Sequence, residues 1–394
     1  MTERSYLDHA ATTRMLPQAQ QRWLEVSSLM GNPSSLHDSG RRARRIVEEA
    51  RESIAADLRT RPSAVIFTSG GTEADNLAVK GLFWLGETQG RNGVIASSIE
   101  HHAVLDPVKW LGEHEGARVH WAAVDAAGRV DPSDIESALA AHEVALCTVM
   151  WANNEVGTVQ PVAALAALCR SYGVPFHTDA VQVLGQLPMD LGELGAAAVT
   201  VSGHKVGGPF GVGALIVDPD LKLTPVLHGG GHEREIRSGT LDAAGVAAFA
   251  VAVREAVSHQ GRFAAEMMDL RNDLISRVLL EVPAAQLNGE PNLDGPDRLP
   301  ANAHFTFAGC EGDALLLLLD AAGIDCSTGS ACTAGIPEPS HVLLAMGAEP
   351  QASRGSLRFS LGRETTKSDV DHLLDVLPAA VDRARRAGSV RSRS

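Results

Sequence analysis

The sequence predicts an α/β protein with a large domain built on a mostly parallel sheet and a smaller α+β domain. Short apolar runs typical of buried strands alternate with segments of helical apolar period, such as residues 162–172. This alternation indicates a parallel sheet covered by helices on both faces. The chain has 394 residues, more than one hydrophobic core usually serves, so two domains are expected.

The expected strands of the large domain are short aliphatic runs bounded by polar residues or glycine. In sheets of this kind ligands bind at the carboxyl ends of the strands, so the residues that follow each run are the first candidates for a site. In chain order the expected strands are residues 64–68, 93–97, 145–151, 174–178, 197–202 and 213–217.

The polar, proline-containing stretch 288–300 ends this alternation. Beyond it the pattern predicts a second domain, and the segment before it, residues 243–281, is expected to form one long bridging helix. We assign residues 16–257 to the large domain, and 1–15 with 258–394 to the small one. The elements expected in the small domain are a strand at 304–307, a helix at 311–322 and a strand at 356–361.

The composition argues against a nucleic-acid-binding, membrane-spanning or disulfide-rich secreted protein. Lys and Arg total 34 against 48 for Asp and Glu, a formal net charge of -14, which disfavours direct nucleic-acid binding. No apolar run approaches the roughly 20 residues of a membrane span, and the first residues lack the order of a signal peptide, so a cytoplasmic protein is expected. Five irregularly spaced cysteines predict free thiols rather than a disulfide framework.

Lys205 and Asp179 are the strongest candidates for chemistry. Lys205 follows an expected strand and precedes glycines, a place where partial burial lowers an ammonium pKa and allows a Schiff base. Taken alone it could equally be a solvated surface lysine. Asp179 follows a second expected strand, and a lysine with such a carboxylate is the pair that pyridoxal phosphate needs, one for its aldehyde and one for its ring nitrogen.

The segment 69–76, SGGTEADN, follows another expected strand. Gly71 and Thr72 at a helix start would point backbone N–H groups at a phosphate, although Thr72 could instead be a simple helix cap. Ser202 and His204, which flank the lysine, would add donors to the same phosphate and favour the binding interpretation.

Imidazole and amide side chains follow two further strands. His101 or His102 could stack on a pyridine ring and move protons, whereas two adjacent histidines without a third ligand do not predict a metal site. The polar cluster 153–155, which includes Asn154, is better explained as the rim of a binding site than as core packing.

Cys332 lies in the small-residue loop 327–335, where a thiol is expected to be accessible enough to act as a nucleophile. The other cysteines, Cys147, Cys169, Cys310 and Cys326, are interpreted as inert core residues. Arg358 or Arg354, near the last expected strand, could clamp a substrate carboxylate.

Taken together, the ordered motifs resemble those of the cysteine desulfurases of the NifS/IscS type, in the fold-type I group of pyridoxal phosphate enzymes. The resemblance runs nearly from end to end, and its order is far more specific than any single motif. The motifs are YLDHAATT at 6–13, GNPSSLH at 31–37, SGGTEADN at 69–76, EHHAVLD at 100–106, NNEVGT at 153–158, HTDAVQ at 177–182, SGHK at 202–205, RSGT at 237–240, GSACTAG at 329–335 and LRFSLGR at 357–363.

The resemblance implies a homodimer that binds pyridoxal 5'-phosphate and converts L-cysteine to L-alanine, with the sulfur held on Cys332 as a persulfide. It assigns Lys205 to the covalent link with the cofactor, Asp179 to the ring nitrogen, and His101 to stacking and proton transfer. It further assigns Gln182 and Asn154 to the phenolic oxygen side, Gly71, Thr72, Ser202 and His204 to the phosphate, and Thr240 to the phosphate of the neighbouring subunit. For the substrate carboxylate we expect Arg358, with help from Asn32.

Sulfur acceptors such as an iron–sulfur scaffold or a tRNA-thiolating enzyme are the implied partner proteins. Two departures from the family pattern, Asp242 after RSGT and the TAG that follows Cys332, leave the proposed roles unchanged.

Two alternative functions stay open. An aminotransferase, or a lyase acting on selenocysteine or kynurenine, would not need Cys332, and a scaffold without activity would not need to keep Lys205, Asp179 and His101 together.

Overall fold

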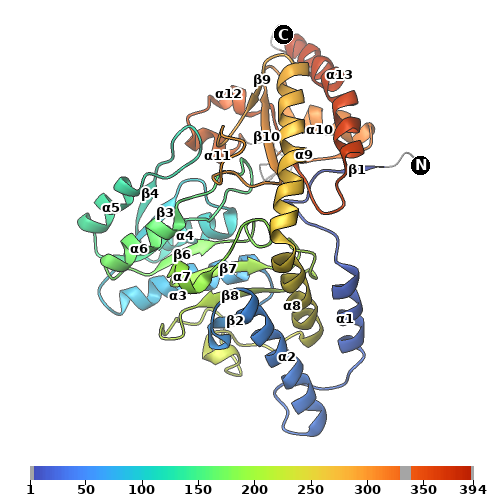
Figure 1. The fold of residues 1–394 in the computed structure, drawn as a ribbon. Helices are drawn as coiled ribbons and strands as arrows, with labels where there is room; N and C mark the ends of the chain where they lie inside the picture. The colour runs from blue at the N-terminus through green and yellow to red at the C-terminus, as the bar shows by residue number, and fades with distance from the viewer. Residues whose placement is uncertain (1–3, 329–338, 392–394) are drawn as a thin grey trace.

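The computed structural model describes residues 4–328 and 339–391. Figure 1 shows a large lobe built around one sheet and a small lobe at the upper end, with α9 running between them. The sequence-based expectation of an α/β fold is confirmed, and the two lobes meet at the carboxyl ends of the parallel strands.

The large lobe contains a seven-stranded sheet in the order β2-β8-β7-β6-β5-β3-β4. Strand β8 runs antiparallel to both of its neighbours, and the remaining pairs are parallel. The strands are β2 (Val65–Thr68), β3 (Gly93–Ser97), β4 (Arg118–Ala122), β5 (Val144–Thr148), β6 (Phe176–Asp179), β7 (Ala198–Ser202) and β8 (Gly213–Val217).

The edge strand β4 was not expected from the sequence. Its residues, RVHWA, include an exposed arginine and only one buried side chain, so the run lacks the apolar signature of the interior strands. Strand β5 ends at Thr148, three residues earlier than predicted. The residues after it bend over the sheet edge, where the Trp151 backbone N–H donates to the Asp179 carbonyl at 2.8 Å.

Alternate residues of the strands face two separate apolar clusters, as the period of a strand requires. Phe67 and Val199 belong to one cluster, while Ile66 and Ala198, their chain neighbours, belong to the other. The helices that cover these faces are α1 (Pro17–Ser27), α2 (Asp38–Asp57), α3 (Gly71–Glu87), α4 (His102–His114), α5 (Pro132–Ala141), α6 (Val162–Ser171), α7 (Leu191–Leu194) and α8 (Ala243–Ser258), with short 3-10 turns at Pro62–Ala64 and Glu233–Glu235.

The prediction of one bridging helix over 243–281 was wrong. The chain forms α8, which ends at Ser258, and α9 (Gln260–Glu281), separated at His259, whose φ of -106° and ψ of 4° are not helical. The Gln260 side chain donates to the Gln186 carbonyl at 2.9 Å, which ties the break to the large lobe. The chain therefore changes direction where it passes from one lobe to the other (Figure 1).

The small lobe packs a three-stranded antiparallel sheet, in the order β12-β10-β9, against α9, α10 and α13. Phe305, Phe307 and Phe359 lie in its core with Leu7 from the beginning of the chain. The domain boundary at 257 and 258 stays a prediction. The elements are β1 (Ser5–Tyr6), β9 (Ala285–Leu287), β10 (Asn302–Phe307), α10 (Gly312–Ala321), β11 (Ile324–Asp325), α11 (His341–Ala345), α12 (Pro350–Ser353), β12 (Ser356–Ser360) and α13 (Lys367–Arg391).

Two long-range pairings fix the first residues of the chain. Strand β1 runs parallel to β11, and the Ala10 backbone N–H donates to Ser360 Oγ at 2.8 Å. These contacts draw the following residues, up to Thr13, across the sheet edge between the lobes, where the Thr13 N–H bonds to the His204 carbonyl. None of the helices in residues 4–328 and 339–391 is both long enough and apolar enough to cross a membrane.

Candidate active site

A cavity of about 420 Å³ lies where the carboxyl ends of β5, β6 and β7 meet the small lobe. It brings together residues from both lobes and from the segment after β1. Of the residues predicted from sequence, Gly71, Thr72, His101, Asn154, Asp179, Gln182, Ser202, His204, Lys205 and Arg358 line this cavity.

Lys205 follows β7 in a turn that is open to this cavity. Its Nζ donates to the backbone carbonyls of Ala10 and Ala11. Burial lowers the Lys205 pKa to about 8, and the positive charge of Arg358 acts in the same direction. About a tenth of the amine is therefore unprotonated at pH 7, far more than for an ordinary lysine, and only this neutral form can attack an aldehyde.

This pKa leads to a test on the protein freed of cofactor. The rate at which Lys205 joins covalently to added pyridoxal phosphate should rise about tenfold per pH unit below pH 8 and level off above it, because only the neutral amine attacks and it predominates above its pKa. Borohydride trapping at timed intervals, followed by mass spectrometry of the peptide containing Lys205, measures the rate. A rate that keeps rising to pH 10 would show an ordinary lysine.

Asp179 ends β6, and its Oδ1 accepts the Val181 backbone N–H at 2.8 Å. The side chain is 6% exposed, and burial raises its pKa to about 6 despite the opposing effect of the Lys205 ammonium. Asp75, 1% exposed on the second turn of α3, lines the same cavity, and its pKa is raised by burial and by the negative charge of Asp179. A cation beside Asp179 would relieve this cost, as a protonated ring nitrogen does.

The phosphate end of the site offers hydrogen-bond donors that the protein itself does not use. The N-cap of helix α3 is Gly70, which has no side chain that could accept a hydrogen bond, so the alternative of a cap by Thr72 was wrong. The first backbone N–H groups of the helix therefore stay available for an anion. Ser202 Oγ is buried, lines the cavity, and has no hydrogen-bond partner among the described residues. Hydrogen-bond donors without a protein partner, beside a helix N-terminus, fit the phosphate of pyridoxal phosphate.

His101 is the residue that caps α4, and its Nδ1 accepts the Ala103 backbone N–H at 3.1 Å. That bond uses the lone pair of Nδ1, so the proton of the neutral ring sits on Nε2. Burial, and then the positive charge of Lys205, lowers the His101 pKa to about 4. His101 therefore presents a neutral ring with an N–H donor.

Arg358 reaches the cavity from β12 and is 4% exposed. It donates to Asp8 Oδ1 at 2.7 Å and to the Asn154 carbonyl at 2.9 Å, while its Nε has no partner among the described residues. An unused donor on a buried guanidinium suits a carboxylate ligand. Arg354, the other arginine considered, follows α12 and does not line the cavity.

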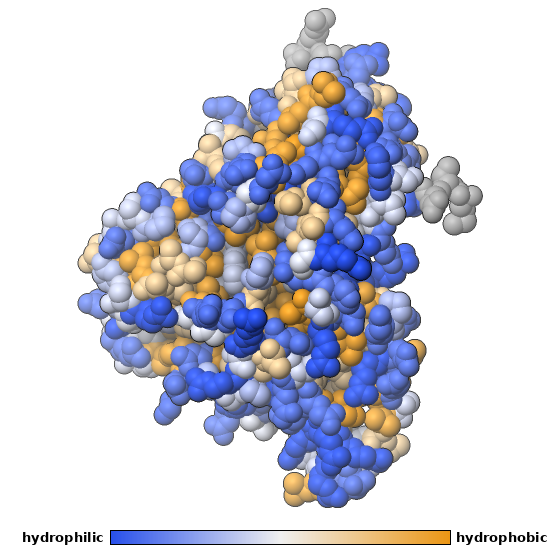
Figure 2. Space-filling model, in the orientation of Figure 1, coloured by the Kyte–Doolittle hydropathy of each residue, from blue (hydrophilic) through white to orange (hydrophobic). Residues whose placement is uncertain are grey.

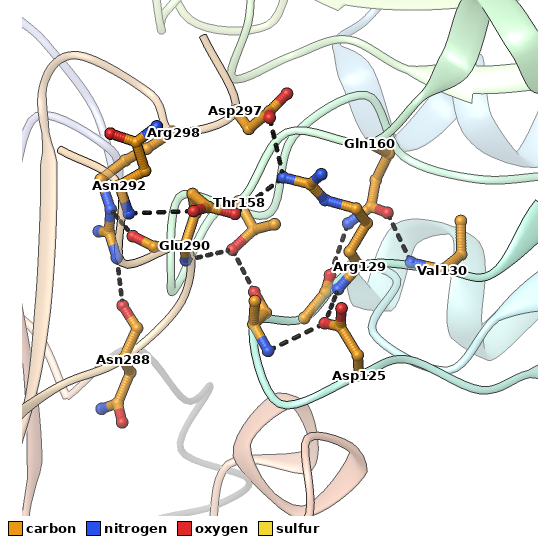
Figure 3. A network of polar contacts seen from close by, with 12 residues as sticks. Asp125, Arg129, Val130, Thr158, Gln160, Asn288, Glu290, Asn292, Asp297 and Arg298 are labelled. Carbon is orange, nitrogen blue, oxygen red and sulfur yellow. Dashed lines mark hydrogen bonds and ion pairs between the residues drawn. The ribbon is translucent and has the colours of Figure 1, made fainter. Parts of the chain in front are cut away.

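A polar network joins the loop that carries Asn154 to the small lobe (Figure 3). Arg298, 2% exposed, donates to the carbonyls of Glu290 at 2.7 Å, Asn288 at 2.5 Å and Val156 at 3.2 Å. Arg129 of the large lobe pairs with Glu290 at 2.8 Å and with Asp297 at 3.1 Å. The network therefore positions the Asn154 loop between the lobes.

We expect Arg298→Met to lower the free energy of unfolding by about 2–4 kcal/mol, because several buried carbonyls lose their donor and no water can replace it. Denaturant unfolding followed by circular dichroism measures the change. The control is Arg262→Met, since the Arg262 side chain is 75% exposed and forms a surface pair with Glu266 at 3.5 Å. Equal, small effects of both substitutions would contradict the proposed role of the network.

Two predicted site residues lie away from this cavity, and a third cannot be placed relative to it. Asn32 lies in the exposed loop between α1 and α2, where its Oδ1 accepts the Ser34 N–H at 2.9 Å. Thr240 is exposed before α8. Cys332 lies outside the described residues. The other four cysteines are free and buried, which confirms their interpretation as core residues.

Sequence reasoning missed several residues that line the cavity. Glu155 was expected only at a rim but is 2% exposed, and Ala10 and Ala11 act through their carbonyls, which no sequence pattern reveals. His341, at the start of α11, had no sequence signal at all. Among the described residues, no group of three or more His, Cys, Asp or Glu side chains could hold a metal ion.

Comparisons with known proteins agree with this geometry. The family described as aminotransferase class V matches residues 5–373. An IscS-like cysteine desulfurase of Mycobacterium tuberculosis is 54% identical over 97% of this chain and 98% of its own length, and the cysteine desulfurase IscS of Dictyoglomus turgidum is 40% identical over 98% and 96%.

Solved structures of NifS-like proteins have the same fold as this chain. A NifS-like protein superimposes with a TM-score of 0.88 at 32% identity, covering 96% of this chain and 99% of the other. A NifS-like protein from Rickettsia africae superimposes with a TM-score of 0.86 at 29% identity, covering 96% and 100%. With the lysine, the carboxylate and the phosphate cradle in one cavity, the chain belongs to the class V aminotransferase family and is a pyridoxal phosphate-dependent cysteine desulfurase of the IscS type.

Proposed function

We propose that this chain converts L-cysteine to L-alanine and holds the released sulfur on Cys332 as a persulfide. The observation that supports this most directly is the meeting of Lys205, Asp179 and Arg358 in one cavity at the carboxyl ends of the sheet. It provides an amine, an acid for the ring nitrogen, and a cation for the substrate carboxylate.

The cofactor, when bound, draws electrons from the α-carbon of the substrate. Lys205 would hold the cofactor, and its Nζ would take the α-proton of the substrate, for which a pKa of about 8 is well suited. Asp179 keeps the ring nitrogen protonated. His101 would stack on the ring and donate its Nε2 proton, and Gln182 and Asn154 would contact the phenolic oxygen side.

The other predicted residues hold the two anionic groups. Gly71 and Thr72 present their backbone N–H groups to the phosphate, and Ser202 and His204 add side-chain donors. Arg358 binds the substrate carboxylate through Nε, the donor that the protein leaves unused. The remaining guanidinium bonds, to Asp8 and to the Asn154 carbonyl, fix the direction from which the substrate enters.

A homodimer completes the site. Met30 is 88% exposed, Leu36 82% and Phe210 73%, large apolar side chains that a second copy would cover. Figure 2 shows hydrophobic atoms at the lower end of the molecule, where the loop between α1 and α2 lies in Figure 1. In this dimer Thr240 reaches the phosphate of the neighbouring subunit, and Asn32 assists at the substrate.

The persulfide supplies sulfur to acceptor proteins in the cytoplasm. An iron–sulfur scaffold protein and a tRNA-thiolating enzyme are the two classes of acceptor proposed. The net charge of -14 makes a protein acceptor more suitable than direct contact with the tRNA.

The direct test incubates the purified protein, loaded with pyridoxal phosphate, with L-cysteine and a reducing thiol. Alanine and sulfide should form in equal amounts. Formation of pyruvate and ammonia would indicate a lyase, and consumption of a keto acid with formation of a new amino acid would indicate an aminotransferase. Either of these results would overturn the proposal.

A further inference from the structure

Glu73 places a negative charge at the same helix end that offers its N–H groups to the phosphate. It is the third residue of α3, and it lies in the first turn of that helix. An acidic residue at this position stabilises a helix, because it complements the positive end of the helix dipole. The same charge opposes the binding of a phosphate dianion there. The state of this carboxylate therefore bears directly on cofactor binding.

The residues around the phosphate cradle supply no counter-charge at close range. A second cavity, of about 460 Å³, adjoins the first and is lined by Gly71, Ser202 and His204 together with Glu73. Among the described residues that line this second cavity there is no lysine or arginine. Burial, and then the positive charge of Lys205, lowers the pKa of His204 to about 4, so its ring is neutral near pH 7.

Both carboxylate oxygens of Glu73 accept hydrogen bonds from the protein. Arg237 Nε donates to Oε1 at 2.7 Å, and Arg237 Nη2 donates to Oε2 at 3.2 Å. Oε2 also accepts the Ser69 backbone N–H at 2.7 Å and the Ser69 hydroxyl. Burial raises the Glu73 pKa, but the hydrogen bonds from Arg237 and Ser69 outweigh it, so the pKa is lowered and the group is ionised.

The pair between Arg237 and Glu73 is largely withdrawn from solvent. The two side chains are 14% and 17% exposed, so salt and water screen their charges weakly. The guanidinium meets the carboxylate with two donors, the bidentate arrangement that makes such pairs strong and directional. Arg237 therefore balances the charge of Glu73 and fixes the direction of its carboxylate.

The segment that carries Arg237 is held in an uncommon backbone conformation. The turn 233–235 has successive φ angles of 44°, 60° and 63°, in the left-handed region that non-glycine residues rarely adopt. Arg51 Nη2 pairs with Glu233 Oε1 at 2.6 Å, and Glu233 Oε2 accepts the Phe67 N–H at 2.7 Å. A strained turn persists only where the surrounding contacts fix it. These contacts therefore set the place from which Arg237 reaches α3.

The proposed binding of the phosphate at the start of α3, on which this inference rests, requires that the charge of Glu73 be compensated. We propose that Arg237 is a positioning residue for the cofactor, which neutralises Glu73 and holds its carboxylate on Ser69 so that the start of α3 accepts a phosphate dianion. Arg237 acts through Glu73 in this role, and it does not itself bind the phosphate.

The test compares the affinity of the cofactor-free protein for pyridoxal phosphate with its affinity for pyridoxal, which lacks the phosphate. Arg237→Met should weaken the binding of pyridoxal phosphate about tenfold or more, because an uncompensated carboxylate then lies at the phosphate site. Its affinity for pyridoxal should stay close to that of the parent, since pyridoxal brings no dianion to α3. Titration followed by tryptophan fluorescence measures both affinities.

Two further variants distinguish charge from packing. Glu73→Gln removes the charge but keeps an acceptor for the Ser69 N–H, so it should bind pyridoxal phosphate at least as tightly as the parent. The double variant, Arg237→Met with Glu73→Gln, should regain most of the affinity that Arg237→Met loses. If the pair only held the loop in place, the double variant would stay weak, because the contact is broken in it as well.

Arg277→Met is the matched control. Arg277 of α9 pairs with Asp371 of α13 at 2.5 Å, and its side chain is 30% exposed. The substitution therefore removes the same charge and a comparable ion pair, but within the small lobe. Both affinities should equal those of the parent. Circular dichroism of each variant checks that the fold is kept.

The outcomes separate this inference from the proposed function. A parent that binds pyridoxal phosphate no more tightly than pyridoxal would overturn the proposed phosphate site and this inference together. If the parent prefers pyridoxal phosphate, the role of Arg237 alone is overturned by parental affinity of Arg237→Met, by an equal loss for both ligands, or by a double variant as weak as Arg237→Met. Weaker binding of pyridoxal phosphate by Glu73→Gln would overturn it too, even where Arg237→Met does not fold. None of these measurements needs turnover of L-cysteine, so a failure of the proposed reaction would be seen separately.

Discussion

Lys205→Ala is expected to reduce alanine formation at least about 1,000-fold and to leave the cofactor bound without a covalent link. The substitution removes both the amine that joins the aldehyde and the base that takes the α-proton, and a single proton-transfer group is commonly worth 10²–10⁴ in rate. The phosphate cradle at Gly71 and Ser202 is untouched, so the cofactor should still bind.

Borohydride treatment followed by denaturation measures the covalent link. In the parent, the reduced cofactor should stay on the peptide containing Lys205, whereas the variant should release it. Lys222→Ala, which removes an exposed lysine outside the cavity, is the control and should match the parent. Turnover by the Lys205→Ala protein at a rate near that of the parent would remove the central claim of the mechanism.

Cys332→Ser is expected to abolish persulfide formation, with alanine formation reduced about 100-fold or more. A serine hydroxyl is a weak nucleophile toward sulfur at neutral pH, because it is scarcely ionised. Cofactor loading and the first spectral change on adding L-cysteine should persist, since neither requires the thiol. This combination separates loss of the sulfur acceptor from loss of the cofactor.

Mass spectrometry of peptides, after brief exposure to L-cysteine, locates the sulfur. One additional sulfur is expected on Cys332. The described cysteines make poor competitors: Cys326 is 8% exposed, and burial raises its pKa to about 12, while burial also raises the pKa of Cys310. Extra sulfur on Cys326 or Cys310 in the parent, or an unimpaired Cys332→Ser enzyme, would exclude Cys332 as the acceptor.

The interior of the fold could be predicted from sequence because its signals are local. Strands β3 and β8 have the predicted bounds, since each is a continuous aliphatic run between polar residues or glycines. Strand β4 could not be found in this way, because its side chains at the sheet edge are partly exposed and polar. The break at His259 depends on a contact with the other lobe, which local periodicity does not contain.

The same distinction applies to the site. Lys205 and Asp179 could be found because both follow apolar strands whose ends meet at one edge of the sheet. The carbonyls of Ala10 and Ala11 and the imidazole of His341 could not, because distant segments bring them into place. The sequence also does not reveal which hydrogen-bond donors of a binding residue stay without a partner in the folded protein. The unused Nε of Arg358 and the lone Ser202 hydroxyl became visible only in the folded protein.

The contacts of Asp8 and Ala10 with β12 set an order of events during synthesis on the ribosome. Asp8 contacts Arg358, and Ala10 contacts Ser360, each across 350 positions of sequence. At translation rates of about 5–20 residues per second, Asp8 and Ala10 wait roughly 20–70 s for these partners to be translated. Until then the carbonyls that hold Lys205 are not in place. A nascent chain can therefore build the large sheet early, but it should recruit cofactor productively only after β12 has left the exit tunnel.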